Sequence, residues 1–103
     1  MNKYNSIAIA PVRSLEVGDL IALPAVGNSG VIGGKVTGLA CAVSDLTKEQ
    51  RAYMFDRGME IPHEEGAPIG GPKTLLIFGE FSNHPNHIFL DFDRNVAVFP
   101  PKE

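Results

Sequence analysis

The chain has very little cysteine, and this shortage excludes whole classes of protein. Its 103 residues include one cysteine, Cys41, so no disulfide can form within the chain. A secreted scaffold held by disulfides is therefore excluded, and so is a zinc site made of several cysteines. Because Cys41 stands in the apolar run "GLACAV", we expect a small buried hydrophobe and not an activated nucleophile.

Positive charge is also scarce. Nine Lys and Arg residues face twelve Asp and Glu residues, which gives a net charge of −3. Proteins that bind nucleic acids usually carry a basic patch or stripe. The basic residues here are scattered singly along the chain, so we expect no nucleic-acid partner.

Long apolar runs are missing as well. A membrane-spanning helix needs about 18 or more consecutive apolar residues, and no segment approaches that length. The apolar part of the N-terminus, Ile7 to Ala10, is too short for a signal peptide and is closed by Pro11. We therefore expect a soluble, cytoplasmic protein without a membrane partner.

Turn-forming residues are abundant. The 11 glycines and 8 prolines follow no collagen-like period, so they indicate many short elements. The length predicts a single domain, residues 1–103. We expect a mainly β fold, a small barrel or sandwich of about five to seven short strands with one α-helix.

The alternation of apolar residues predicts where the strands lie. Three glycines, Gly33, Gly34 and Gly38, indicate a bulge or a close approach of two backbones. The last two segments, on either side of "DRN", both have their apolar residues at even-numbered positions. This match predicts that they pair as a hairpin. The predicted strand segments are Ser6–Val12, Ser14–Leu23, Val31–Val43, Thr74–Phe81, Ile88–Phe92 and Val96–Phe99.

The helix is predicted at Lys48–Arg57. Thr47 and Gln50 have the spacing of a capping box, and Gly58 follows the last turn. The segment Glu60–Pro72 comes next and contains three prolines and three glycines. A loop of this length is uncommon in a compact domain and is often functional.

Known catalytic motifs do not fit this chain. Aligning Gly34-Lys35 with a phosphate-binding loop places Ser29 where the first glycine belongs and Val36 where a hydroxyl is needed. The "HEE" at His63 lacks both the second histidine of a metalloprotease and the cysteines of a deaminase. No G-x-S-x-G is present, so a serine hydrolase triad is not indicated.

The segment "SNHPNHIFLDFD" contains two histidines, His84 and His87, which are weak candidates for a metal site. On one straight strand His87 and Asp91 would be roughly 13 Å apart, too far to share an ion. The alternative function is a small metal-dependent enzyme that uses these two histidines with His63. The simpler interpretation is an exposed hairpin tip between two strands.

A second set of residues is predicted to form an interaction surface. Phe89 and Phe99 stand at odd-numbered positions, on the face of their strands opposite to the apolar one. Either they contact a partner, or the fold buries both faces of these strands. The long loop and the hairpin tip are the other parts of this surface. The residues predicted to form it are His63, Glu64, Glu65, Ile69, His84, Pro85, Asn86, His87 and Phe89.

Residues 16–45, "EVGDLIALPAVGNSGVIGGKVTGLACAVSD", resemble small β-barrel proteins that decorate phage heads. Those proteins often have a V-x-x-G-D strand entry, a Gly-rich turn and a "G-x-A-x-x-D" strand exit, here Gly38 to Asp45 with altered spacing. The helix and the last two strands depart from that pattern. The resemblance implies a capsid-surface or assembly role and transfers no site residues.

Together these features predict a non-enzymatic binding or assembly module. We expect it to be a phage or mobile-element accessory protein, capsid-associated or directed at a host protein as an inhibitor. It would need no cofactor and would act through a protein partner or through self-association. If the resemblance holds, the protein would be found in the virion.

Overall fold

The structure, a computed structural model, describes residues 6–24, 30–82 and 84–100 of the chain. The strands are β1 (Ala8–Pro11), β2 (Leu20–Pro24), β3 (Val31–Ala40), β4 (Thr74–Phe81), β5 (His87–Asp91) and β6 (Asn95–Phe99). The helix α1 (Lys48–Asp56) follows β3, and two 3₁₀ turns lie at Val12–Ser14 and Val43–Asp45.

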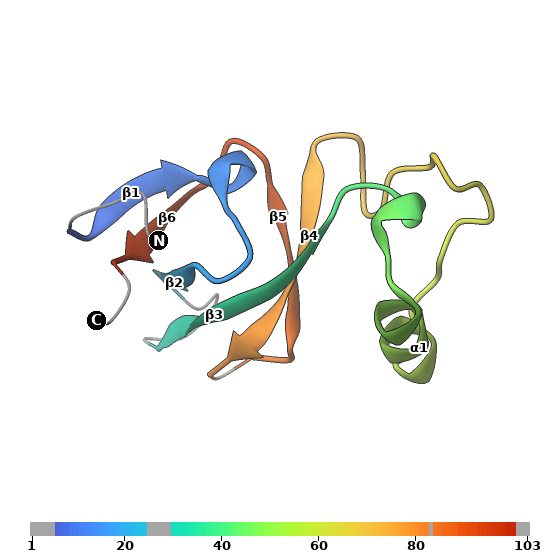
Figure 1. The fold of residues 1–103 in the computed structure, drawn as a ribbon, viewed down its shortest axis with the longest axis horizontal. Coiled ribbons are helices and arrows are strands. Elements are labelled where there is room, and N and C mark those ends of the chain that lie inside the picture. The colour runs from blue at the N-terminus through green and yellow to red at the C-terminus, as the bar shows by residue number, and fades with distance from the viewer. Residues whose placement is uncertain (1–5, 25–29, 83, 101–103) are drawn as a thin grey trace.

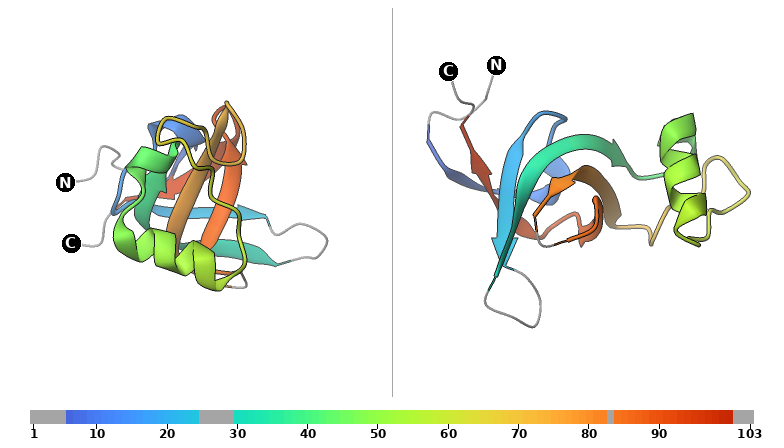
Figure 2. Two further views of the ribbon diagram at one scale, coloured as in Figure 1. Left: turned by 90° about the vertical axis from the view of Figure 1, so that its right-hand side faces the viewer. Right: turned by 90° about the horizontal axis from the view of Figure 1, so that it is seen from below.

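The six strands form one antiparallel sheet in the order β1-β6-β2-β3-β4-β5. The sheet curls strongly around its own interior, and α1 lies outside it at the far end of β3 and β4 (Figures 1 and 2). The prediction of a mainly β fold with one helix is confirmed. The sheet does not close into a barrel, because β1 and β5 remain as its edges.

The predicted hairpin of Ile88–Phe92 with Val96–Phe99 is wrong. β5 pairs with β4, whereas β6 pairs with β1 and β2. The connection between them is held by the first 3₁₀ turn, where the Val12 N–H donates to the Arg94 carbonyl at 2.8 Å. This bond extends the pairing of β1 with β6, and β2, β3 and β4 lie between β6 and β5 in the sheet.

The chain turns sooner after β3 than the sequence indicates. The Asp45 carboxylate accepts hydrogen bonds from the backbone N–H groups of Cys41 (2.9 Å) and Ala42 (3.0 Å). This turn ends β3 at Ala40 and leaves Cys41 exposed, so the prediction that Cys41 is buried is wrong. In the segment predicted from Ser14, the turn expected at Gly18 is present, and the chain becomes extended after it at Leu20.

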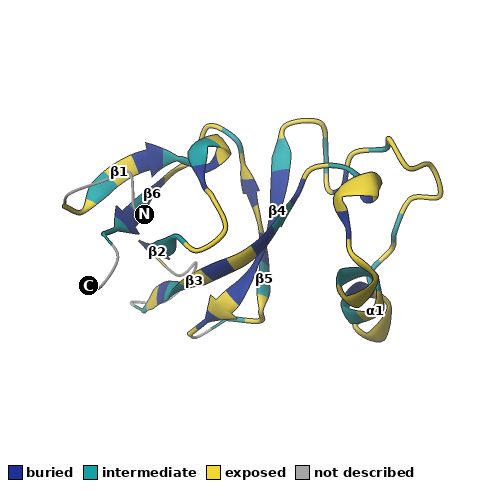
Figure 3. Ribbon diagram, viewed as in Figure 1, coloured by how far each residue is buried: buried dark blue, intermediate teal, exposed yellow. Residues whose placement is uncertain are grey.

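Two hydrophobic clusters hold the fold together, and Figure 3 shows the buried positions concentrated along β3, β4 and their neighbours. The first cluster fills the interior of the curled sheet and consists of Ala10, Val12, Leu15, Ile21, Leu23, Ile32, Val36, Leu75, Ile77, Phe81, Ile88, Leu90, Val96 and Val98. The second cluster joins the opposite face of β4 to α1 and the loop, and consists of Ala40, Val43, Leu46, Met54, Ile69, Leu76 and Phe78.

A bulge bends β3 where the two clusters meet. Val36 is opposite Gly79 and Gly38 is opposite Phe78, so Thr37 is the extra residue in β3. A bulge adds local twist and bend to the strand that carries it. Because of the bend, the N-terminal half of β3 contributes side chains to the first cluster and its C-terminal end contributes Ala40 to the second.

Two adjacent glycines of β3 allow a test of the contact between β3 and β4. A Cβ at Gly34 would lie 2.0 Å from the Glu80 carbonyl oxygen, whereas a Cβ at Gly33 would have no neighbour closer than 3.5 Å. We expect Gly34→Ala to lower the free energy of unfolding by roughly 3 kcal/mol, because the clash is with backbone. Gly33→Ala should change it by less than about 1 kcal/mol.

Urea unfolding of both variants measures the difference. Equal stabilities would mean that β3 and β4 are not in close contact at this point.

Candidate functional site

The fold brings α1, the segment after it and the outer face of β5 together on one side of the molecule. We call this surface the α1–β5 face. It consists of Tyr53, Arg57, Met59, Glu60, Ile61, Pro62, His63, Ile69, Gly70, His87 and Phe89.

Both ends of α1 are fixed by local hydrogen bonds. The predicted capping box is present, since the Gln50 N–H donates to the Thr47 hydroxyl at 3.1 Å and the Thr47 N–H donates to the Gln50 amide oxygen at 2.9 Å. The helix ends at Asp56. Gly58, with a φ of 72°, permits the chain to reverse, and the Met59 N–H donates back to the Met54 carbonyl at 3.0 Å. Met54 is fully buried, so this side of α1 faces the second cluster.

A row of rings runs from α1 along β5. The centroid of the Tyr53 ring lies 5.9 Å from that of Phe78 and 5.5 Å from that of His87. The centroids of His87 and Phe89 are 6.1 Å apart, and all three pairs are edge to face. The Tyr53 hydroxyl lies 2.8 Å from Nδ1 of His87. The guanidinium of Arg57 covers the other side of Tyr53 at 4.3 Å. Edge-to-face geometry and cation–π stacking are both favourable for aromatic rings.

The long loop is held against the chain that follows β3. Arg51 donates to the Val43 carbonyl and to the Glu65 carboxylate, each at 3.0 Å. The Ile69 N–H donates to the Cys41 carbonyl at 2.9 Å. The loop is irregular, as predicted, yet its path is fixed by these bonds.

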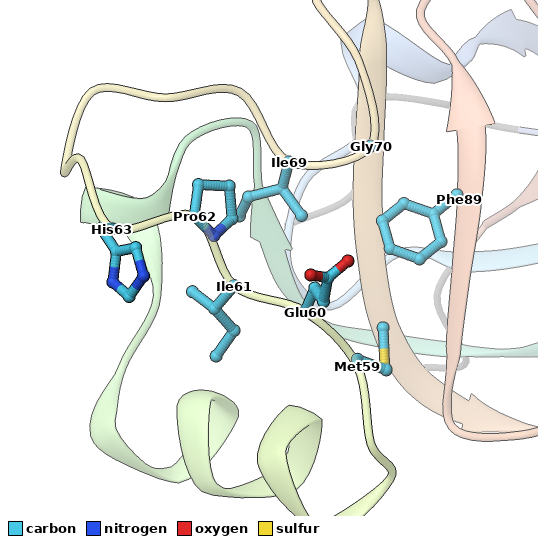
Figure 4. Close-up of a pocket in the computed structure, with 8 residues that line it drawn as sticks. All are labelled: Met59, Glu60, Ile61, Pro62, His63, Ile69, Gly70 and Phe89. Carbon is cyan, nitrogen blue, oxygen red and sulfur yellow. The ribbon is translucent and has the colours of Figure 1, made fainter.

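A pocket of about 500 Å³ lies between this loop and β5, as Figure 4 shows. Met59, Ile61 and Phe89 supply apolar side chains to its lining, and Glu60 supplies its one carboxylate. Gly70 has a φ of 77°, and a Cβ there would lie 2.8 Å from the ring of Phe89. Glycine therefore lets the loop approach the ring closely enough to form one wall of the pocket.

The predicted surface residues divide between this face and other positions. His63, Glu64, Glu65, Pro85 and Asn86 are exposed. His84 is half-buried, and Phe89 is 38% exposed at the rim of the pocket.

Ile69 is only 2% exposed, because the bridge between Ala42 and Pro68 draws it into the second cluster. Ile69 lines the pocket beside Phe89 and is not exposed, so the prediction that it is a surface contact residue is wrong. The sequence indicated Tyr53 and Phe89 as possible contact residues but did not indicate that they lie together, because the contacts between α1 and β5 are long-range. Arg57 and Met59 were not indicated as parts of this site.

The histidines do not meet as metal ligands. Within the part of the chain that the structure describes, no three His, Cys, Asp or Glu side chains lie close enough to hold an ion. His84 has Nδ1 at 3.0 Å from the Pro85 carbonyl oxygen, and His87 has its Nδ1 engaged with Tyr53. The geometry gives the metal-dependent alternative no support.

The surroundings of His87 and of Cys41 shift the pKa of each side chain. Burial lowers the pKa of His87, and the charges of Arg57 and His84 lower it further. The neutral ring is therefore favoured near pH 7, and its Nδ1 shares a hydrogen bond with the Tyr53 hydroxyl. Partial burial, followed by the nearby Asp45 carboxylate, raises the pKa of the Cys41 thiol, so it is not activated as a nucleophile.

The lowered pKa of His87 predicts how stability depends on pH. Because the pKa of His87 is lower in the folded state, the unfolded chain binds the proton more readily. The contribution of His87 to the free energy of unfolding is complete above pH about 6.5 and is lost as the pH falls toward the folded-state pKa. Tyr53→Phe should lower that free energy by about 1 kcal/mol at pH 7.5.

Urea unfolding at pH 7.5 and 5.0, with NMR titration of the His87 ring, measures both effects. His87→Gln should remove this component of the pH dependence, and the matched change at the exposed loop residue, His63→Gln, should leave it in place. An NMR pKa for His87 above that of an exposed histidine would contradict the prediction.

Comparison of the chain with protein-family models, with curated proteins and with solved structures gives no match in any of the three. In the described residues, no helix is long and apolar enough to cross a membrane.

Proposed function

We propose that the protein is a non-enzymatic binding module that contacts a protein partner through the α1–β5 face. The observation that carries this proposal is the apolar pocket beside Phe89, which remains 38% exposed at the end of the ring row. Aromatic residues, methionine and arginine are enriched at protein interfaces, and this face combines Tyr53, Phe89, Met59 and Arg57.

The shape of the pocket indicates what the partner supplies. A pocket with an apolar lining accepts an apolar side chain, and such buried anchors usually provide most of the binding energy. Glu60 is the one carboxylate in the lining, so a basic residue next to that anchor would be complementary in charge. The rigid support comes from α1 and β5, because the ring row fixes one to the other.

The biological placement rests on the resemblance of residues 16–45 to phage head-decoration proteins. It favours an accessory protein of a phage or mobile element, either part of the virion or acting on a host protein in the cytoplasm. The partner would accordingly be a capsid component or a host protein.

Site-specific photo-crosslinking in the cell of origin tests the proposal. A photoreactive residue at Ile61, which lines the pocket, should capture one defined protein, identified by mass spectrometry. The same residue at Val17, which is 63% exposed elsewhere on the molecule, should not capture it.

Substitutions test the same contact with the purified partner. Phe89→Asp should weaken binding at least about tenfold, since it places a charge where the anchor is buried. Val17→Asp makes the same kind of change on another exposed apolar residue and should have no effect. Equal capture at both positions, or unchanged binding by Phe89→Asp, would refute the role of this face.

A further inference from the structure

The free edge of β5 has the hydrogen-bonding groups of an unpaired strand. At the ends of the β4–β5 ladder, the Phe92 N–H donates to the Lys73 carbonyl at 2.9 Å and the Gly79 N–H donates to the Asn86 carbonyl at 3.1 Å. In an antiparallel pair, hydrogen-bonded and non-hydrogen-bonded residues alternate along each strand. The even-numbered residues of β5 therefore bond to β4, and the odd-numbered ones direct their main-chain groups to the free edge.

Those outward-directed residues are His87, Phe89 and Asp91. In the described part of the chain, no strand pairs with β5 on this side. The Asp91 carbonyl accepts a hydrogen bond from the Arg94 N–H at 3.1 Å. Among the residues that the structure describes, none outside β4 bonds to the main chain of Phe89. A row of donors and acceptors of this kind is a template for another extended strand.

The sequence of β5 is complementary to itself in one antiparallel register. With Phe89 opposite Phe89 of the second copy, His87 lies opposite Asp91 of the second copy, and the same pair recurs on the other side of the two-fold axis. In this register, the pairs Phe89–Phe89 and His87–Asp91 lie at positions where the two main chains exchange hydrogen bonds. The same register therefore forms the main-chain bonds and brings these side chains together. Aromatic pairs are favourable across neighbouring strands, and the neutral ring of His87 can donate a hydrogen bond to the Asp91 carboxylate of the second copy.

The inner face of β5 fits the same register. Ile88 would lie opposite Leu90 of the second copy, and both residues belong to the first cluster of their own chain. The apolar interior would therefore continue from one sheet into the other.

From this geometry we propose that two copies of the chain pair through β5 and form a two-fold symmetric dimer with a continuous sheet. The inference goes beyond the proposed function, because it rests on the main-chain edge of β5 and not on the pocket. An isologous contact of this kind closes on itself and leaves no further edge of β5 to pair.

The other edge of the sheet is less suited to pairing. In β1, Val12 bonds to Arg94 and Ala10 is opposite Val96, so the outward-directed residues are Ile9 and Pro11. Proline has no N–H to donate, and prolines at sheet edges prevent further strands from adding. β5 contains no proline.

A disulfide trap tests the register. In a Cys41→Ser background, Phe89→Cys would place two thiols on opposite hydrogen-bonded residues, with Cα atoms about 5.5 Å apart, which a disulfide can span. Mild oxidation should convert most of this variant to a covalent dimer. Ile9→Cys on β1 and Phe55→Cys on α1, both highly exposed in the native chain, should remain largely monomeric in the same background.

Light scattering on the native sequence tests the dimer itself. The mass should rise from 11.1 kDa toward twice that value with concentration. Phe89→Pro should abolish the rise, because it removes an N–H that the monomer does not use. Asp91→Lys should weaken association at least tenfold, and Glu49→Lys, with the same charge change on α1, should not. Hydrogen exchange of the Phe89 amide should slow as the dimer forms.

A mass of 11.1 kDa at every concentration, or a dimer that survives Phe89→Pro, would overturn the inference. Cross-linking of Phe89→Cys no faster than that of Phe55→Cys would also overturn it. The pocket is tested separately: capture at Ile61 without a dimer refutes only the edge pairing, and a dimer without capture at Ile61 refutes only the proposed function.

Discussion

The burial of β4 on both faces is the constraint on which the rest of the structure depends. Its odd-numbered residues Leu75 and Ile77 belong to the first cluster, and its even-numbered residues Leu76 and Phe78 belong to the second. A strand that is apolar on both faces must be covered on both. The curled sheet covers one face, and α1 with its loop covers the other, so the position of the α1–β5 face follows from the composition of β4.

Much of the secondary structure could be predicted because its signals are local. The capping residues Thr47 and Gln50 and the apolar run of β4 are read within a few residues, and the structure has both. The pairing of β5 could not be predicted in the same way. Apolar parity shows which face of a strand is buried and says nothing about which strand lies beside it, so the same pattern suited β6 and β4 equally.

The candidate site was predictable only in part, for the same reason. Phe89 and His87 were indicated by their outward parity, and the structure places both on the α1–β5 face. Tyr53 joins them through a contact across 34 positions of sequence, which no local pattern reveals. Cys41 was misjudged because its apolar neighbours suggested a continuing strand, whereas the carboxylate of Asp45 turns the chain there.

The second cluster is built largely from the connection between β3 and β4, two strands that are direct neighbours in the sheet. The connection bears its own helix, its own ion pair between Arg51 and Glu65, and one wall of the pocket. Neighbouring antiparallel strands can be joined by a tight turn, so the sheet does not need this connection to define its topology. Mutational drift in the connection could thus alter what the protein recognises while the curled sheet keeps its architecture.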